Sequence, residues 1–177
     1  MKTYISLLRG INVGGKNIIK MSDLKQVYEN LNFKNIRTYI QSGNVVFETE
    51  KSEIQEIEND ISNKIFENFG FNVPVTIVEK NEFQIIVENN PFNITDVDFK
   101  NFHVTFLKSY PVHEDINKIN SEIYLPDEFR VIQKSVYLNI KNGYGNTKLT
   151  NTFLESKFKT TATTRNWNTI IQLLKIL

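Results

Sequence analysis

The feature that most constrains the fold is an order of secondary-structure elements that the sequence pattern predicts twice. The first half predicts a strand at 3–8, a helix at about 22–31, a hairpin at 36–48, a long helix after Ser52, a strand at 73–78 and a helix near 80–88. The second half predicts a strand at 102–107, a short helix near 112–120, a hairpin at 128–140, a helix near 148–158, an extended piece at 160–163 and a helix at 165–176. Each half follows the order βαββαβ plus one helix, which is typical of a ferredoxin-like plait.

Local signals support several of these boundaries. Ser22 is the expected N-cap of the first helix. Ser52, with Gln55 three residues later, has the pattern of a capping box that begins the long helix, and Gly70 is expected to end it. The predicted class is therefore α+β, with two pseudo-duplicated plait halves.

The expected domain organisation follows from this repeat. The first plait half covers 1–90 and contains the RGINVGGK loop, 91–100 is the junction, and the second half covers 101–177 with the GYGNTK loop and the TTRNWNT helix. Sequence identity between the halves is not evident, so the repeat exists only in the order of elements. A chain of 177 residues, 40% of them hydrophobic, can form one packed domain or two small ones.

The first loop nearly matches a nucleotide-binding P-loop. Gly10–Lys16 satisfies G-x-x-x-x-G-K, but the next residue is Asn17, where the motif needs a Ser or Thr hydroxyl to hold Mg²⁺. The strand before the loop fits the motif. The helix start at Ser22 comes about six residues too late to place its N–H groups on the phosphates. The loop is therefore interpreted as a possible anion site and not as an NTPase motif.

Two further clusters could contribute to such a site. Gly143, Gly145 and Lys148 precede the helix predicted near 148–158, where free backbone N–H groups favour an anion, although the glycines could simply serve a turn. Thr163 or Thr164 is expected to cap the last helix, which places Arg165 in its first turn. A cation there opposes the helix dipole, so a bound anion or a carboxylate such as Glu155 is expected to compensate it.

The candidate ligand-binding residues combine these loops with the tip of the first hairpin, whose polar residues also suit a turn. They are Arg9, Asn12, Gly14, Gly15, Lys16, Gln41, Ser42, Asn44, Gly143, Gly145, Lys148, Arg165 and Asn166. Arg9, Lys16, Lys148 and Arg165 are the expected charge partners. The catalytic residues are unknown, because Ser42 lacks both a nucleophile-elbow motif and an evident base.

Composition and charge exclude several classes of function. The chain has no Cys, and its two histidines, His103 and His113, lack metal-binding spacing, so we expect neither a metal nor a cofactor. No signal peptide or membrane-spanning run is evident, so a cytoplasmic protein is expected. Residues 1–50 carry seven Lys and Arg against four Asp and Glu, and residues 134–177 carry seven against one. The two ends could form one positive face, or the charges could simply be solvated.

Taken together, the segments Leu8–Lys16, Thr38–Asn44 and Thr163–Thr169 resemble the bacterial domain of unknown function 1697 family over essentially the whole chain. Gly143, Gly145 and Lys148 also fit the resemblance. It implies an α+β, plait-like fold in a cytosolic bacterial protein. It implies no activity and transfers no catalytic residue.

Three hypotheses on function remain open. The first is a protein that binds, or acts on, an anionic phosphate-bearing small molecule where the loops at 9–17 and 143–148 and the helix start at 164–166 converge. The second is nucleic-acid binding, for which Tyr4 and Phe47 could present aromatic rings on the central strands of a plait. The third is a structural or protein-interaction module, in which Arg9, Asn12, Gln41 and Arg165 are bonded internally. The oligomeric state cannot be predicted from these patterns.

Overall fold

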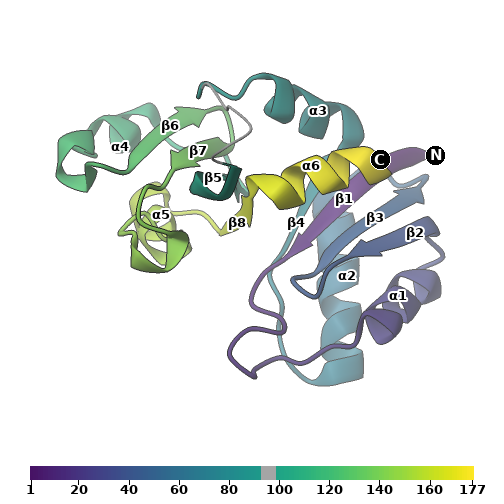
Figure 1. The fold of residues 1–177 in the computed structure, drawn as a ribbon. Helices are drawn as coiled ribbons and strands as arrows, with labels where there is room; N and C mark the ends of the chain where they lie inside the picture. Colours follow the sequence, from purple (N-terminus) through teal and green to yellow (C-terminus); the bar gives the residue numbers. More distant parts are fainter. Residues whose placement is uncertain (93–98) are drawn as a thin grey trace. The chain divides into compact units, whose positions relative to one another are not determined.

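A computed structural model describes residues 1–92 and 99–177, so 93–98 of the predicted junction lie outside the described residues. The chain divides into two compact units (Figure 1). Unit 1 consists of Met1–Ile85 and Gln172–Leu177, and unit 2 consists of Ile86–Ile171.

Unit 1 contains one four-stranded antiparallel sheet with the strand order β2-β3-β1-β4. Its elements are β1 (Lys2–Leu8), α1 (Met21–Asn30), β2 (Lys34–Tyr39), β3 (Asn44–Thr49), α2 (Ile54–Phe69), β4 (Val75–Glu79) and the start of α3 (Lys80–Glu88). The helices α1 and α2 lie on the same face of the sheet (Figure 1).

Alternation along the strands decides which residues of unit 1 face these helices. Tyr4 and Leu8 of β1 are fully buried in one core cluster with Leu24 of α1 and Ile61 of α2. Ile5 and Leu7 of β1 point to the opposite face and are also fully buried. Both faces of this sheet are therefore covered, which explains why β1 is a nearly continuous apolar run.

A carboxylate of α2 contacts the outer side of the edge strand β4. Glu58 is buried, and its Oε1 accepts a hydrogen bond of 3.1 Å from the backbone N–H of Ile77. Ser62 of the same helix donates to the carbonyl of Val73 at 3.0 Å. These two contacts fix α2 along the strand that ends the sheet.

Unit 2 repeats the arrangement with the strand order β6-β7-β5-β8. Its elements are the end of α3, η1 (Phe99–Asn101), β5 (Phe102–Leu107), α4 (His113–Asn117), η2 (Ser121–Tyr124), β6 (Glu128–Ile132), β7 (Ser135–Asn139), η3 (Tyr144–Asn146), α5 (Asn151–Phe158), β8 (Ala162–Asn166) and most of α6 (Trp167–Ile176). Its core includes Leu138, Leu149, Leu154 and Phe158. On the other face of the sheet, Tyr137 donates from its hydroxyl to the carbonyl of Ile86 at 2.8 Å, and burial raises its pKa to about 12.

Two backbone hydrogen bonds occur at equivalent places in both units. In unit 1, the Leu8 N–H donates to the Gly43 carbonyl at 2.8 Å, and the Arg9 N–H donates to the Pro74 carbonyl at 3.0 Å. In unit 2, the Leu107 N–H donates to the Lys134 carbonyl at 2.8 Å, and the Lys108 N–H donates to the Thr161 carbonyl at 3.0 Å. In each unit, these bonds join the end of the first strand to the hairpin turn and to the loop before the fourth strand. The predicted α+β class and the two similar plait halves are thus confirmed.

The helix starts differ from the predictions. α1 begins at Met21 after Lys20, so Ser22 lies inside the helix, and α2 begins at Ile54 after Glu53 with no side-chain cap at either start. The capping box at Ser52 is therefore wrong. The chain before α2 is instead held by Tyr4, whose hydroxyl donates to the Lys51 carbonyl at 3.1 Å. The helix end at Gly70 is confirmed, with φ 77° in the left-handed region.

Within the described parts of the chain, no helix combines the length and the apolar character needed to cross a membrane.

Candidate functional site

Three loops of unit 1 meet at one end of its sheet. They are the β1–α1 loop (residues 9–20), the β2–β3 turn (40–43) and the α2–β4 loop (70–74), joined by the Leu8 and Arg9 backbone hydrogen bonds. All the predicted site residues of the first half belong to two of these loops or to the strand residue that follows the turn. The structure thus brings the first-half candidates to one end of the unit.

Asn12 links the β1–α1 loop to the β2–β3 turn. Its backbone is left-handed, with φ 54°, a conformation that Asn tolerates better than most residues. Its Nδ2 donates to the carbonyls of Ile19 at 2.9 Å and Gln41 at 2.8 Å, while its Oδ1 accepts from the Ile19 N–H at 2.9 Å. Asn12 therefore acts as a structural connector, with both ends of its amide engaged inside the protein.

Gly14 and Gly15 form the tip of a small hairpin. Val13 and Lys16 pair across the tip, and the Lys16 N–H donates to the Val13 carbonyl at 3.1 Å. Gly14 has φ 58° and Gly15 has φ 73°, the pair of positive values that a type I′ turn requires. The glycines thus serve a turn about six residues before α1, and the loop does not place a helix N-terminus as a P-loop does.

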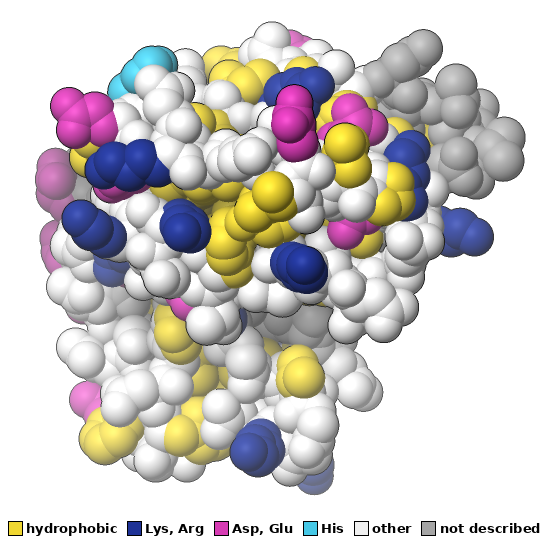
Figure 2. Space-filling view, turned by 90° about the vertical axis from the view of Figure 1, so that its left-hand side faces the viewer, with side chains coloured by type: hydrophobic (Ala, Val, Ile, Leu, Met, Phe, Trp, Pro, Cys, Tyr) yellow, Lys and Arg dark blue, Asp and Glu magenta, His cyan; other side chains and the backbone are white. Residues whose placement is uncertain are grey.

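Two lysines at this loop end have no carboxylate partner among the described residues, unlike Lys51 elsewhere in unit 1. Lys16 and Lys20 are exposed, and neither forms an ion pair with any described residue. No Asp or Glu occurs in residues 9–20, 36–44 or 70–74. Figure 2 shows one face of the molecule, where Lys and Arg side chains are exposed beside hydrophobic ones.

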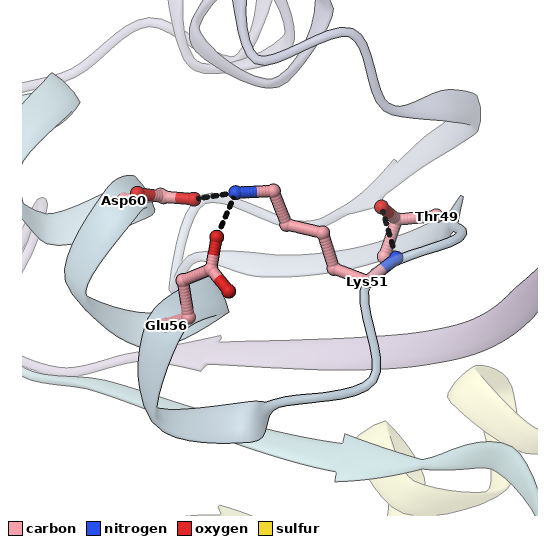
Figure 3. Close-up of polar contacts among 4 residues, drawn as sticks. All are labelled: Thr49, Lys51, Glu56 and Asp60. Atoms are coloured by element: carbon pink, nitrogen blue, oxygen red, sulfur yellow. Dashed lines mark hydrogen bonds and ion pairs between the residues drawn. The ribbon is translucent and has the colours of Figure 1, made fainter.

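Lys51 shows the contrasting arrangement, in which the protein neutralises its own cation (Figure 3). Its Nζ contacts the carboxylates of Glu56 at 2.5 Å and Asp60 at 2.6 Å, and these hydrogen bonds raise its pKa. The Lys51 N–H donates to Thr49 Oγ1 at 3.2 Å. A lysine held between two carboxylates is a poor site for an anion, so we do not include Lys51 in the candidate site.

The β2–β3 turn places its predicted residues in different environments. Asn44 is fully buried and donates from Nδ2 to the Tyr39 carbonyl at 3.0 Å and to Ser42 Oγ at 2.9 Å. Ser42 is half-buried, and Gln41 is exposed. Asn44 therefore stabilises the turn, whereas the role of the exposed Gln41 in ligand binding stays a prediction.

The second glycine loop belongs to unit 2 and does not lead straight into a helix. Gly143 has φ 84° and precedes η3, a 3₁₀ turn closed by a 3.0 Å hydrogen bond from Asn146 N–H to the Gly143 carbonyl. The next helix, α5, begins at Asn151, with Thr150 accepting from the Phe153 N–H at 3.2 Å. Lys148 is exposed but lies before this cap, so the expected helix start at 148 is wrong.

Arg165 lies on the strand β8, not in the first turn of the last helix. β8 pairs with β5 through Ala162–Asn166, and α6 begins at Trp167, where Asn166 Oδ1 accepts from the Thr169 N–H at 2.8 Å. Arg165 is buried, which lowers its pKa to about 10, and it donates to the Thr164 carbonyl at 3.0 Å. The expectation that Arg165 opposes the α6 dipole is therefore wrong, because strand pairing with β5 continues through this residue.

His103 connects the two candidate segments of unit 2, a role that its position in the sequence does not reveal. On β5 it pairs with Asn166 of β8, and its ring stacks on Tyr144 of the glycine loop with centroids 4.8 Å apart. Its Nδ1 lies 3.2 Å from the Asn101 carbonyl. No sequence spacing signals this contact, since the two rings are 41 positions apart and belong to separate elements.

We expect the His103–Tyr144 contact to weaken as the pH falls. Burial lowers the pKa of His103 from 6.5, so the unfolded chain binds a proton at a pH where the folded protein does not. The stability that this residue contributes is complete above about pH 6.5 and is lost as the pH falls toward the lower, folded-state pKa. Urea denaturation between neutral and mildly acidic pH should show that the free energy of unfolding of His103→Phe depends less steeply on pH than that of the wild type. Substitution of the exposed His113 by Gln is the control, and equal slopes for both variants would contradict the expectation.

The candidate residues therefore form two sets. Arg9, Asn12, Gly14, Gly15, Lys16, Gln41, Ser42 and Asn44 share one end of unit 1, and Gly143, Gly145, Lys148, Arg165 and Asn166 belong to unit 2. Convergence of the two sets on one ligand stays a prediction.

A groove of about 670 Å³ lies along β2, but its lining, which includes Lys25, Lys34 and Glu48, contains none of the candidate residues. In the described part of the chain, no group of three or more His, Asp or Glu side chains is placed to hold a metal ion.

Comparison with known proteins agrees with this architecture. The family model described as "Protein of unknown function (DUF1697)" matches residues 1–137. The chain is similar in fold to the conserved bacterial protein SP0830 from Streptococcus pneumoniae, with a TM-score of 0.69, 22% identity, and coverage of 99% of this chain and 98% of that one. None of the curated proteins matches the chain. The protein therefore belongs to the DUF1697 family of proteins of unknown function.

Proposed function

We propose that the protein binds an anionic, phosphate-bearing small molecule at the loop end of unit 1. The observation that carries the proposal is that Lys16 and Lys20 are exposed on loops without any carboxylate, whereas Lys51 of the same unit is neutralised by two carboxylates. An anion at this end gains attraction from both lysines without competing with an internal partner. Arg9, half-buried at the base of the loop, adds a third positive charge.

Preorganisation of the loop also supports the proposal. Asn12 fixes the β1–α1 loop to the β2–β3 turn, so binding an anion requires little ordering of the chain. The exposed N–H groups of Gly14 and Gly15 form no hydrogen bond with any residue that the structure describes. Such groups can donate to phosphate oxygens next to the Lys16 side chain.

The other two hypotheses fit the geometry less well. Tyr4 and Phe47 are fully buried, with ring centroids 6.0 Å apart inside the core, so they cannot stack on bases. The internal hydrogen bonds of Asn12 and Asn44 favour a fold-building role for these two residues. These hydrogen bonds do not explain why the side chains of Lys16 and Gln41 are exposed at the same end of the unit.

A titration with soluble phosphates tests the proposal. Calorimetry and thermal unfolding with inorganic phosphate, pyrophosphate and nucleoside triphosphates should identify a ligand, which stabilises the protein by about 2.7 kcal/mol at one hundred times its Kd. Lys16→Glu should weaken binding roughly tenfold or more, because a charge-assisted hydrogen bond contributes about 1.5–3 kcal/mol.

Two control variants assign the site. Lys34→Glu changes an exposed lysine at the opposite end of β2 and should leave the affinity unchanged. Lys148→Glu tests the loop of unit 2, and a loss of affinity there as large as that of Lys16→Glu would support a ligand shared by both loops. No binding of any of these phosphates at low ionic strength would refute the proposal.

A further inference from the structure

The loop end of unit 1 exposes three branched aliphatic side chains. Val13 and Ile18 in the β1–α1 loop are 64% and 60% exposed, and Ile40 in the β2–β3 turn is 49% exposed. Ile40 also has φ 48°, a left-handed conformation that is a rare and unfavourable one for a β-branched residue. The protein thus accepts backbone strain at a residue whose side chain contributes little to its core.

Hydrogen bonds bring together the backbone segments that carry these side chains. Asn12 Nδ2 binds the carbonyls of Ile19 and Gln41, the residues next to Ile18 and Ile40 in the chain. Val13 and Lys16 are paired across the hairpin of the same loop. We refer to Val13, Lys16, Ile18, Lys20 and Ile40 as the loop-end surface.

The equivalent end of unit 2 has the same character, although its sequence differs. There the loop after β5 exposes Tyr110 and Val112, and Ile132 is exposed at the end of β6, next to the β6–β7 turn. Lys134 lies over the Tyr110 ring at 5.6 Å, and Lys108 is the counterpart of Arg9 in the repeated backbone hydrogen bonds. Exposed apolar residues beside cations thus occur at the same place in both plait units.

We propose that the loop-end surface docks on an anionic phospholipid bilayer. The aliphatic side chains enter the boundary between headgroups and acyl chains, and the Lys16 and Lys20 ammonium groups contact lipid phosphates. The absence of carboxylates from these loops suits a negatively charged surface. The combination of lysine with aliphatic residues is less suited to a protein partner, because protein interfaces are depleted in Lys and enriched in aromatic residues. This inference goes beyond the proposed small-molecule function, since the bound object is a surface.

Vesicle co-sedimentation tests the proposal with the full chain. The protein should bind vesicles of phosphatidylcholine mixed with phosphatidylglycerol, should not bind pure phosphatidylcholine vesicles, and should dissociate as salt is added. The double substitution Val13→Ser with Ile18→Ser, and separately Lys16→Glu, should each weaken binding by about tenfold or more. Ile85→Ser, which changes an exposed aliphatic residue of α3, and Lys34→Glu are the matched controls and should bind like the wild type.

The outcomes separate this inference from the proposed function. Vesicle binding without binding of soluble phosphates supports the membrane surface and refutes the small-molecule proposal. Binding of soluble phosphates without vesicle binding supports the small-molecule proposal and refutes the membrane surface. Equal vesicle binding by all variants would overturn the inference. Self-association that the double substitution abolishes would also overturn it, because the surface would then belong to a contact between two copies of the chain.

Discussion

Replacement of Gly43 by alanine is expected to destabilise the protein by about 3 kcal/mol, the sum of a left-handed backbone penalty and overpacking. Gly43 has φ 76°, and an added Cβ would lie 2.7 Å from both Ile11 Cδ1 and Leu8 Cβ. Leu8 cannot move aside easily, because its own N–H is bonded to the Gly43 carbonyl. Urea denaturation monitored by circular dichroism would measure the change in the free energy of unfolding.

Gly70→Ala is the matched control for this prediction. Gly70 has φ 77°, nearly the same as Gly43, but an added Cβ would meet no atom within 4 Å. Its substitution should therefore cost only the backbone penalty, about 1 kcal/mol. Equal destabilisation by the two substitutions would show that close packing at the β2–β3 turn contributes nothing.

Asn12→Ala is the second large expected effect, about 4 kcal/mol, because three hydrogen bonds are lost at about 1 kcal/mol each and the left-handed conformation costs alanine about 1 kcal/mol more. The loss of Asn12 also releases the β1–α1 loop from the β2–β3 turn, since its Nδ2 bonds both segments. Both ligand binding and stability should therefore fall, as measured by urea denaturation and by the phosphate titration.

Asn17→Ala provides the comparison for Asn12. Asn17 lies in the same loop with φ 49°, and its side chain makes one hydrogen bond of 3.0 Å, to the Gly10 carbonyl. Its substitution should destabilise the protein by about half as much, because fewer contacts are lost. A cost for Asn17→Ala that matches or exceeds that for Asn12→Ala would remove Asn12 from its connecting role.

The sequence predicted the fold well because hydrophobic periodicity and turn residues are local properties. The apolar run of β1 and the glycine stop at Gly70 both depend on neighbouring residues, and both correspond to observed elements. The helix start at Ser52 was wrong because a tertiary contact, the Tyr4 hydroxyl bond to the Lys51 carbonyl, fixes the preceding chain. Arg165 was misplaced for a similar reason, since pairing with β5 extends the strand up to the Asn166 cap.

The candidate site was predictable only in part. The glycines of residues 9–17 and Lys16 could be recognised from their spacing, and Gly14 and Gly15 form a turn that requires their positive φ values. The connecting role of Asn12 could not be recognised, because its partner Gln41 lies 29 positions away. The exposure of Val13 and Ile18 likewise depends on the hairpin that Gly14 and Gly15 form.

The contact between Glu58 and Ile77 has a consequence for how this protein avoids self-templated aggregation. β4 is an edge strand, and an unpaired edge presents backbone donors that an incoming strand from another molecule can use. The Glu58 carboxylate takes one such donor, the Ile77 N–H, and places a polar group from α2 beside that edge. A second molecule would have to displace this carboxylate before it could extend the sheet into a fibril-like stack.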